Sequence, residues 1–186
     1  GNINLDEAVT LDALYLGALV GENNGTIISN NDNYSAEKEV YLINYNGEIV
    51  VSNISATSSY VGAVAGYNAG AITNMRVENV FIQASGIDNV GGLVGLSSGS
   101  LQNNYVNASV IGKENVGGLA GQINGANISK NIVELYENDR LAGNTELVVK
   151  AIAGVNNVGG LIGYVNDTNL TNVSNISNNY IKNYLS

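Results

Sequence analysis

The sequence predicts an all-β fold, a parallel β-helix or β-solenoid built from stacked coils. A glycine-rich motif recurs along the chain, the apolar runs are short, and apolar residues never recur at helical spacing over a useful length. Proline is absent, which suits buried strands that need every N–H for pairing. Short strands cannot bury an apolar face alone, so successive coils must stack in register, about 4.8 Å apart, around a common core.

The motif V-G-G-L-x-G defines the repeat, with three nearly identical copies and two weaker ones. The copies occupy residues 15–21, 60–66, 86–95, 112–121 and 154–163. Between their closing glycines, the first and the last interval are much longer than the two in the middle. Because each long interval is close to two short ones, each is expected to contain an additional degenerate coil. The prediction is about seven coils of roughly 20 to 29 residues.

The coil is predicted to have three faces, each lined by apolar side chains. The Leu of the motif forms one internal ladder, and the apolar residue of a following Gly-x-Ile/Leu element forms a second. Apolar residues between the repeats supply the third face. The first ladder is Leu19, Val64, Leu93, Leu119 and Leu161; the second is Ile27, Ile72, Leu101, Ile128 and Leu170; the third face includes Val80, Val106, Val110, Val148 and Ile152.

Glycine and asparagine are assigned to the corners of the coil. The closing glycines from Gly66 onward are expected where φ is positive or where the next coil leaves no room for Cβ. Asn89, Asn115 and Asn157 each precede a copy of V-G-G-L. They are expected to stack at one corner, with side-chain amides bonded along the axis.

The chain is predicted to be a single repeat domain over residues 1–186, a fragment of a longer protein. Its apolar fraction of 45% is sufficient for a continuous core. Irregular coils or loops are expected near residues 30–48 and 133–150, where the intervals between motifs are long.

Composition removes several classes of function. The chain has no His and no Cys, so the usual general base, Ser-His and Cys-His nucleophiles and thiolate metal sites are all missing. Seven basic and 16 acidic residues give a net charge of -9, which argues against nucleic acid. No apolar run is long enough to span a bilayer. We therefore expect no catalytic residue, no metal, no cofactor, no nucleic acid partner and no membrane insertion.

The motif, the Gly-x-Ile/Leu element and an Asn-rich stretch such as Asn103-Asn104-Tyr105-Val106 together resemble the GLUG repeat of bacterial surface and secreted proteins. The resemblance covers residues 15–176. That family includes segments of IgA-cleaving zinc peptidases and of filamentous-haemagglutinin-like adhesins. The resemblance implies a β-helical stalk located outside the cell or on its surface. It transfers no active site, because the H-E-x-x-H helix of such peptidases needs His.

Two groups of side chains are candidate binding sites. Tyr34, Tyr41, Tyr45 and Tyr136 lie in the long intervals and are candidate protein or glycan contacts, although the favoured interpretation is that they cap or cover degenerate coils. The acidic residues within 134–139 could bind calcium, but a solvated loop is the favoured interpretation because no D-x-D/N-x-D/N-G loop is present.

The predicted function is a non-catalytic structural or interaction module, a stalk or adhesin-like region of a bacterial extracellular protein. Its partners would be a host protein or glycan and other domains of the parent chain. One alternative is an accessory substrate-binding region of a secreted zinc peptidase such as an IgA-cleaving enzyme. A second alternative is a solenoid carbohydrate-active enzyme.

Overall fold

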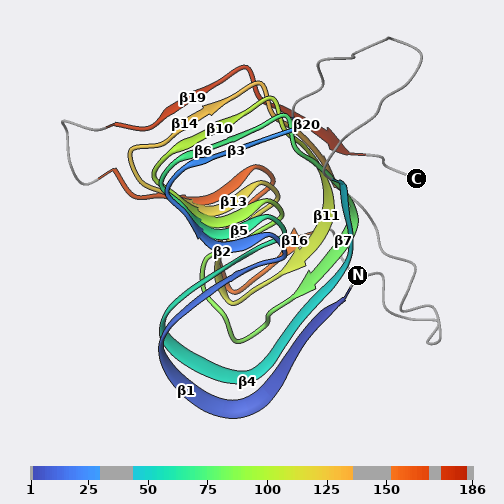
Figure 1. The fold of residues 1–186 in the computed structure, drawn as a ribbon, viewed down its shortest axis with the longest axis vertical. Helices are drawn as coiled ribbons and strands as arrows, with labels where there is room; N and C mark the ends of the chain where they lie inside the picture. Colours follow the sequence, from blue (N-terminus) through green and yellow to red (C-terminus); the bar gives the residue numbers. More distant parts are fainter. Residues whose placement is uncertain (1, 30–43, 136–151, 168–172, 184–186) are drawn as a thin grey trace.

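A computed structural model describes residues 2–29, 44–135, 152–167 and 173–183, and these form parallel strands joined by turns. Figure 1 shows them wound into a stack of coils, and the predicted all-β parallel solenoid is confirmed. None of the residues in these ranges belongs to a helix that could cross a membrane.

The strands belong to three parallel sheets. Sheet A contains β1 (Ile3–Gly17), β4 (Asn44–Gly62), β7 (Arg76–Gln83), β8 (Val90–Gly91), β11 (Tyr105–Ile111), β12 (Glu114–Gly117), β15 (Ile132–Leu135), β16 (Ile152–Ala153), β17 (Asn156–Gly159) and β20 (Tyr180–Asn183). Sheet B contains β2 (Val20–Asn23), β5 (Ala65–Asn68), β9 (Val94–Ser97), β13 (Ala120–Ile123) and β18 (Ile162–Val165). Sheet C contains β3 (Thr26–Ile28), β6 (Ala71–Thr73), β10 (Ser100–Gln102), β14 (Asn127–Ser129) and β19 (Asn175–Ser177).

The expected seven coils are not confirmed, because sheets B and C each have five strands in the described ranges. The two long intervals do not add a rung to sheet B. Strand β2 pairs directly with β5, and β13 pairs directly with β18, although a long interval separates the motifs in each case. Each long interval therefore spans a single step of sheet B. Of the segments expected to be irregular, 44–48 belongs to β4 and 133–135 to β15, and the remainder lies outside the described residues.

The first predicted ladder is confirmed by backbone pairing from rung to rung. The N–H of Leu19 donates to Val64 O, that of Val64 to Leu93 O, that of Leu93 to Leu119 O, and that of Leu119 to Leu161 O. The three middle side chains are fully buried, and Leu161 packs against the same core. Leu19, on the first rung, is 40% exposed.

The second predicted ladder needs one correction. Ile72, Leu101 and Ile128 pair across sheet C, but the next rung is occupied by Ile176 and not by Leu170. Leu170 itself lies outside the described residues. The segment before β19 is longer than in the other coils, so a count from the motif selects the wrong residue.

The third set lies in sheet A, as predicted, but not in a single row. Val106 pairs with Val77, whereas Val80 pairs with Ala108. Val110 does pair with Ile152. Val148 lies outside the described residues.

At the motif glycines, the backbones of sheets A and B approach each other too closely for a side chain to fit between them. A Cβ on Gly121 would lie 2.5 Å from the backbone of Asn89 and Val90, and one on Gly95 would lie 2.4 Å from Val61 N. None of the closing glycines has a positive φ. The steric half of the prediction is therefore confirmed and the positive-φ half is wrong. Left-handed positions are taken mostly by Asn instead, namely Asn53, Asn74, Asn79, Asn89, Asn103, Asn115, Asn157 and Asn178, with Lys130.

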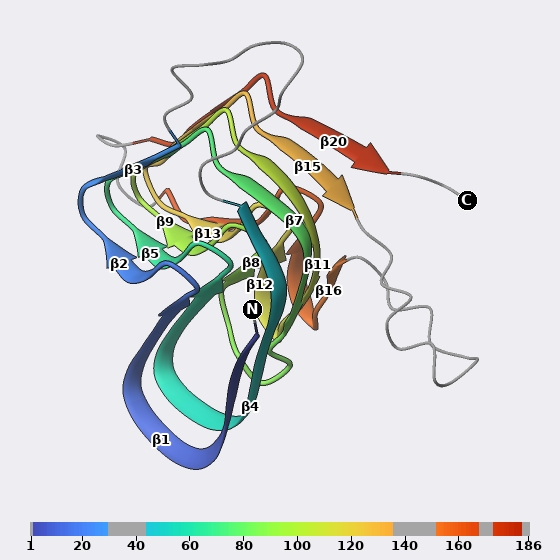
Figure 2. The same ribbon diagram turned by 45° about the vertical axis from the view of Figure 1, so that its right-hand side comes forward.

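Coil 1 (β1 to β3) and coil 2 (β4 to β6) carry a lobe that the later coils lack. Two rows of sheet A stay aligned through the stack, one running from Ile3 to Ile152 and the other from Leu16 to Val158. The chain between the two rows spans 3–16 in coil 1 and 49–61 in coil 2, but only 152–158 in the last coil. The additional residues of β1 and β4 form a wide paired bend below the rest of the stack (Figures 1 and 2).

Candidate functional site

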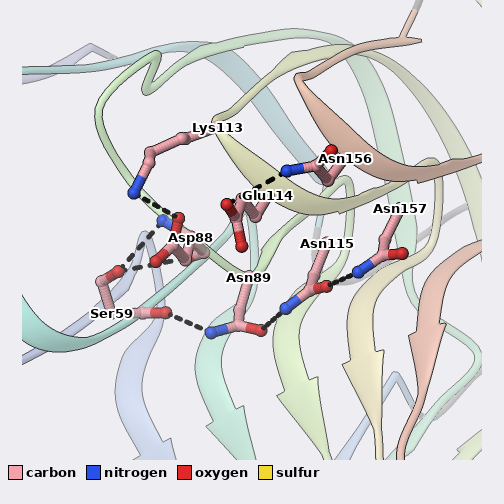
Figure 3. Close-up of polar contacts among 8 residues, drawn as sticks. All are labelled: Ser59, Asp88, Asn89, Lys113, Glu114, Asn115, Asn156 and Asn157. Atoms are coloured by element: carbon pink, nitrogen blue, oxygen red, sulfur yellow. Dashed lines mark hydrogen bonds and ion pairs between the residues drawn. The ribbon is translucent and has the colours of Figure 1, made fainter.

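A corner within sheet A, at the start of β8, β12 and β17, carries the asparagine ladder that the sequence predicts. The Nδ2 of Asn157 donates to Asn115 Oδ1 and the Nδ2 of Asn115 donates to Asn89 Oδ1, both at 2.8 Å (Figure 3). Asn89 then donates to the carbonyl of Ser59 at 3.0 Å. All three asparagines have φ between 52° and 54°. Asn suits this position because it tolerates the left-handed conformation and bonds along the axis.

A second ladder, buried between sheets C and A, went unpredicted. Its members are Asn104, Asn131 and Asn179, of which the first two are at most 1% exposed. The Nδ2 of Asn104 donates to Asn131 Oδ1 and that of Asn131 donates to Asn179 Oδ1, each at 2.9 Å. The Nδ2 of Asn131 also donates to the carbonyl of Leu101, and its Oδ1 accepts from the N–H of Asn104. The signal in the sequence is an Asn that directly precedes the strand after β10, β14 and β19, whereas Met75 takes this place after β6.

A third polar row joins sheets B and C. Asn23 Nδ2 donates to Asn68 Oδ1 at 2.7 Å, and Asn68 Nδ2 donates to Ser97 Oγ at 3.0 Å. All three side chains are buried. Together the three rows give the abundant Asn a structural role, since a buried amide needs partners and the adjacent rungs supply them.

An exposed charged group surrounds the first ladder (Figure 3). Lys113 Nζ lies 3.6 Å from Asp88 Oδ1, and the two side chains are 49% and 40% exposed. The backbone N–H of Asp88 donates to Ser59 Oγ at 3.1 Å, which fixes the turn before the ladder. Asn156 Nδ2 donates to Glu114 Oε1 at 3.2 Å on the next rungs. An ion pair this exposed contributes less than about 1 kcal/mol to stability.

Three tyrosines form an aromatic cluster on coils 1 and 2. The rings of Tyr15 and Tyr60 stack with centroids 5.2 Å apart, and that of Tyr67 lies 6.4 Å from both. Tyr67 also shares a hydrogen bond of 2.8 Å with Ser98. Tyr15 is 43% exposed, so the cluster is accessible to a partner. Sequence reasoning missed the cluster, because Tyr15 and Tyr60 are far apart along the chain and meet only through the pairing of β1 with β4.

A second aromatic group lies on sheet A. Arg76 lies over the ring of Tyr105, with its guanidinium carbon 4.4 Å from the ring centroid, and forms an ion pair with Glu78. The Tyr105 hydroxyl donates to Glu134. Burial, and then this hydrogen bond to a carboxylate, raise the pKa of Tyr105 to about 12.

The calcium site considered at 134–139 is untested, because of its acidic residues only Glu134 lies in a described range. Glu134 is part of β15 and is bonded to Tyr105. Across the ranges described, no three His, Cys, Asp or Glu side chains gather in a way that could hold a metal ion.

The predicted contact tyrosines also remain untested. Tyr34, Tyr41 and Tyr136 lie outside the described residues, and Tyr45 is in β4 but its side chain is not described. Tyr164, which directly follows a motif glycine, is exposed and lies within β18.

The lobe formed by β1 and β4 carries an open pocket of about 430 Å³. Its lining residues are Asn4, Leu5, Asp6, Glu7, Val9, Leu11, Leu14 and Ile54. Asp6 accepts hydrogen bonds from Ser52 Oγ at 2.8 Å and Asn53 Nδ2 at 2.7 Å, and these lower the pKa of its carboxyl. The lining is mixed, with the polar side chains of Asn4, Asp6 and Glu7 beside apolar ones.

No family model, no curated protein and no solved structure matches this chain. The functional assignment therefore rests on the geometry described above and on the repeat itself.

Proposed function

We propose that this chain is a non-catalytic structural and interaction module, a rod that spaces or displays other parts of a bacterial extracellular protein. The observation that supports it most is the continuity of the interior rows. Rows of Leu, Ile and Asn run from rung to rung through the stack. The buried side chains of these rows therefore hold successive rungs together. A stack of this kind resists bending, because every rung is bonded to the next along its length.

The dimensions of such a rod follow from the rung count. Five rungs at about 4.8 Å per step give roughly 19 Å from first to last rung. Repetition of the same motif in a longer chain would extend it in proportion. The resemblance to the GLUG repeat supports placement at the cell surface or outside the cell.

The tyrosine cluster of Tyr15, Tyr60 and Tyr67 is the contact surface we favour for a host glycan or protein. Aromatic rings with hydroxyl edges combine apolar area with hydrogen bonding, and they lose little side-chain entropy on binding. No basic residue lies in the described part of coil 1, which favours neutral or cationic partners over anionic ones.

A binding array of glycans and secreted host proteins tests this proposal. We expect binding without turnover, and we expect Tyr15→Ser to weaken it. The matched control is Tyr180→Ser, since Tyr180 is also exposed but lies at the opposite end of the stack. Hydrolysis of any polysaccharide or protein on the array by the purified chain would overturn the non-catalytic assignment. If Tyr15→Ser and Tyr180→Ser weaken binding equally, the contact surface does not lie at the tyrosine cluster.

A further inference from the structure

Two rows of side chains lie on either side of the line where sheets A and B meet. The first row is the residue directly before the paired Val of β4, β8 and β12, and the second is the residue directly after the closing glycine in β5, β9 and β13. Both rows therefore stay aligned from coil 2 to the coil of β11 to β14. We call them the A–B strip, which consists of Tyr60, Asn89 and Asn115 in sheet A and Tyr67, Leu96 and Gln122 in sheet B.

The two rows of the A–B strip lie close together. A Cβ on Gly66, the residue before Tyr67, would lie 2.8 Å from Tyr60 O. One on Gly121 would lie 2.7 Å from Asn115 O. On coil 2 the rings of Tyr60 and Tyr67 are 6.4 Å apart, so side chains of the two rows meet across the line between the sheets. A single ligand can therefore contact both rows.

The A–B strip lies along the side of the stack and belongs to its inner coils. Five of its six side chains are partly exposed, and Asn89 is buried. Every strand that carries the strip is paired with a neighbour on both sides. A further coil before the first or after the last would thus lengthen the strip and would not cover it.

The side chains of the strip match the chemistry of a carbohydrate. A tyrosine ring offers an apolar face to the C–H groups of a sugar and a polar edge to its hydroxyls. An amide both donates and accepts hydrogen bonds, as a sugar hydroxyl does. Asn115 donates one N–H to Asn89 and accepts one from Asn157, both at 2.8 Å (Figure 3). Because an amide has two N–H groups and two lone pairs, the ladder leaves Asn115 one donor and one acceptor for a ligand.

Charge favours a neutral ligand over an anionic one. No member of the strip is charged. The charged side chains drawn beside the Asn ladder in Figure 3 are Asp88, Lys113 and Glu114, and Lys113 lies 3.6 Å from Asp88. The single base is thus paired with an acid, and an anionic chain would meet net negative charge.

Strand pairing disfavours an extended peptide as the ligand. A peptide that adds to a sheet needs a strand with an unpaired edge. The strands of the A–B strip have neighbours on both sides, so their backbone groups are used within the stack. The strip offers side chains only.

We propose that the A–B strip binds a neutral polysaccharide chain that lies along the stack axis, with one subsite on each coil. The inference rests on the proposed function and names its partner. Equivalent positions recur about every 4.8 Å along the strip, so a ligand that is itself a repeat meets a similar site at each step. The tyrosine rings stack on a sugar at coil 2, and the amides of Asn115 and Gln122 bond to hydroxyls two steps further along.

Isothermal titration calorimetry of the full chain with neutral oligosaccharides of increasing length tests the proposal. The probes are oligomers of glucose, mannose and N-acetylglucosamine, with oligogalacturonides as the anionic comparison. For the neutral series that binds, affinity should rise with each added sugar until the oligosaccharide spans the strip, and should then level off. Affinity should change by less than about twofold between low and physiological salt, because the contact contains no ion pair.

Two variants locate the contact. Tyr67→Ala should weaken binding by about tenfold, as loss of an aromatic anchor does. Gln122→Ala should weaken it by about fivefold, the effect of one hydrogen bond. The matched control is Gln102→Ala, the same change at a partly exposed position of sheet C, and it should leave affinity unchanged. Circular dichroism verifies that each variant is folded.

The outcomes separate this inference from the proposed function. Failure of every neutral series to bind, affinity independent of length, tighter binding of oligogalacturonides, or equal effects of Gln122→Ala and Gln102→Ala would each overturn the inference. An interaction module with a protein ligand would still stand in those cases. Hydrolysis of an oligosaccharide whose binding depends on Gln122 would instead overturn the non-catalytic assignment and support the strip.

Discussion

Replacement of Gly121 by Ala tests how closely sheets A and B approach each other. The added Cβ would lie 2.5 Å from Asn89 C and Val90 N and 2.7 Å from Asn115 O. Ordinary contacts between heavy atoms are about 3.5 to 4.0 Å, so the two backbones must separate by about 1 Å. Backbone atoms cannot rotate away as a side chain can. We therefore expect the upper end of the overpacking range, a loss of about 3 kcal/mol in the free energy of unfolding.

The matched control is Gly86→Ala, because a Cβ there meets nothing within 4 Å. Its free energy of unfolding should stay within about 0.5 kcal/mol of the parent. Urea unfolding followed by circular dichroism measures both variants, and the loss in Gly121→Ala corresponds to a fall in Tm of about 6 to 12 °C for a chain of this size. If the two variants are equally stable, the close approach of the two sheets is wrong.

Three further predictions concern the polar side chains. Asn131→Ala should lower the free energy of unfolding, measured in urea, by about 2 to 4 kcal/mol, because buried partners on two rungs lose their hydrogen bonds. The exposed control Asn156→Ala should change it by no more than about 0.5 kcal/mol. Similar losses in the two variants would refute the role of the buried ladder. The pKa of Asp167 is lowered, first by the backbone N–H of Gly125, so its stabilisation is present at neutral pH and is lost as pH falls through the lowered value; Asp167→Asn should flatten the loss of stability in acid, and an unchanged acid profile would contradict this. The pKa of Tyr105 is raised to about 12, so its stabilisation is present below about pH 10 and is lost as pH rises toward 12. In a spectrophotometric titration, Tyr105→Phe should remove one ionisation step near pH 12, and an unchanged titration curve would contradict this.

The interior ladder was predictable because the motif repeats with its neighbours. Leu93, Leu119 and Leu161 occupy the same place in three nearly identical segments, and identical segments that stack must contribute the same side chain to one row. The stacking of Asn89, Asn115 and Asn157 was predictable for the same reason. Wherever the repeat is regular, sequence spacing and spatial register agree.

The coil count failed where spacing alone had to decide. A long interval between motifs fits two short coils or one coil with an insertion equally well. The pairing of β13 with β18 and of β2 with β5 shows that each long interval spans one step of sheet B, and no local pattern in the sequence carries that information. The second ladder was predicted to contain Leu170 where the structure has Ile176, again because spacing alone had to decide.

The tyrosine cluster and the lobe could not be predicted from the sequence, for a different physical reason. Tyr15 and Tyr60 stack only because β1 and β4 pair in register over their whole bend, apart from one register shift between Asp6 and Val9. Both strands resemble weak copies of the repeat preceded by ordinary polar sequence. Surface features that depend on long-range pairing have no signature in local composition.

The direct pairing of five rungs is the central claim, and one distance tests it. Cysteines replacing Glu22 and Tyr164 can be spin-labelled selectively, because the chain has no other Cys, and diluted with unlabelled protein to suppress contacts between copies. Four rung steps separate these positions in the register of sheet B. A pulsed electron spin resonance measurement should therefore give a narrow distribution centred at about 19 Å, broadened by the label arms. A distribution centred at about 29 Å, as seven rungs would give, or one without a defined maximum, would contradict the account.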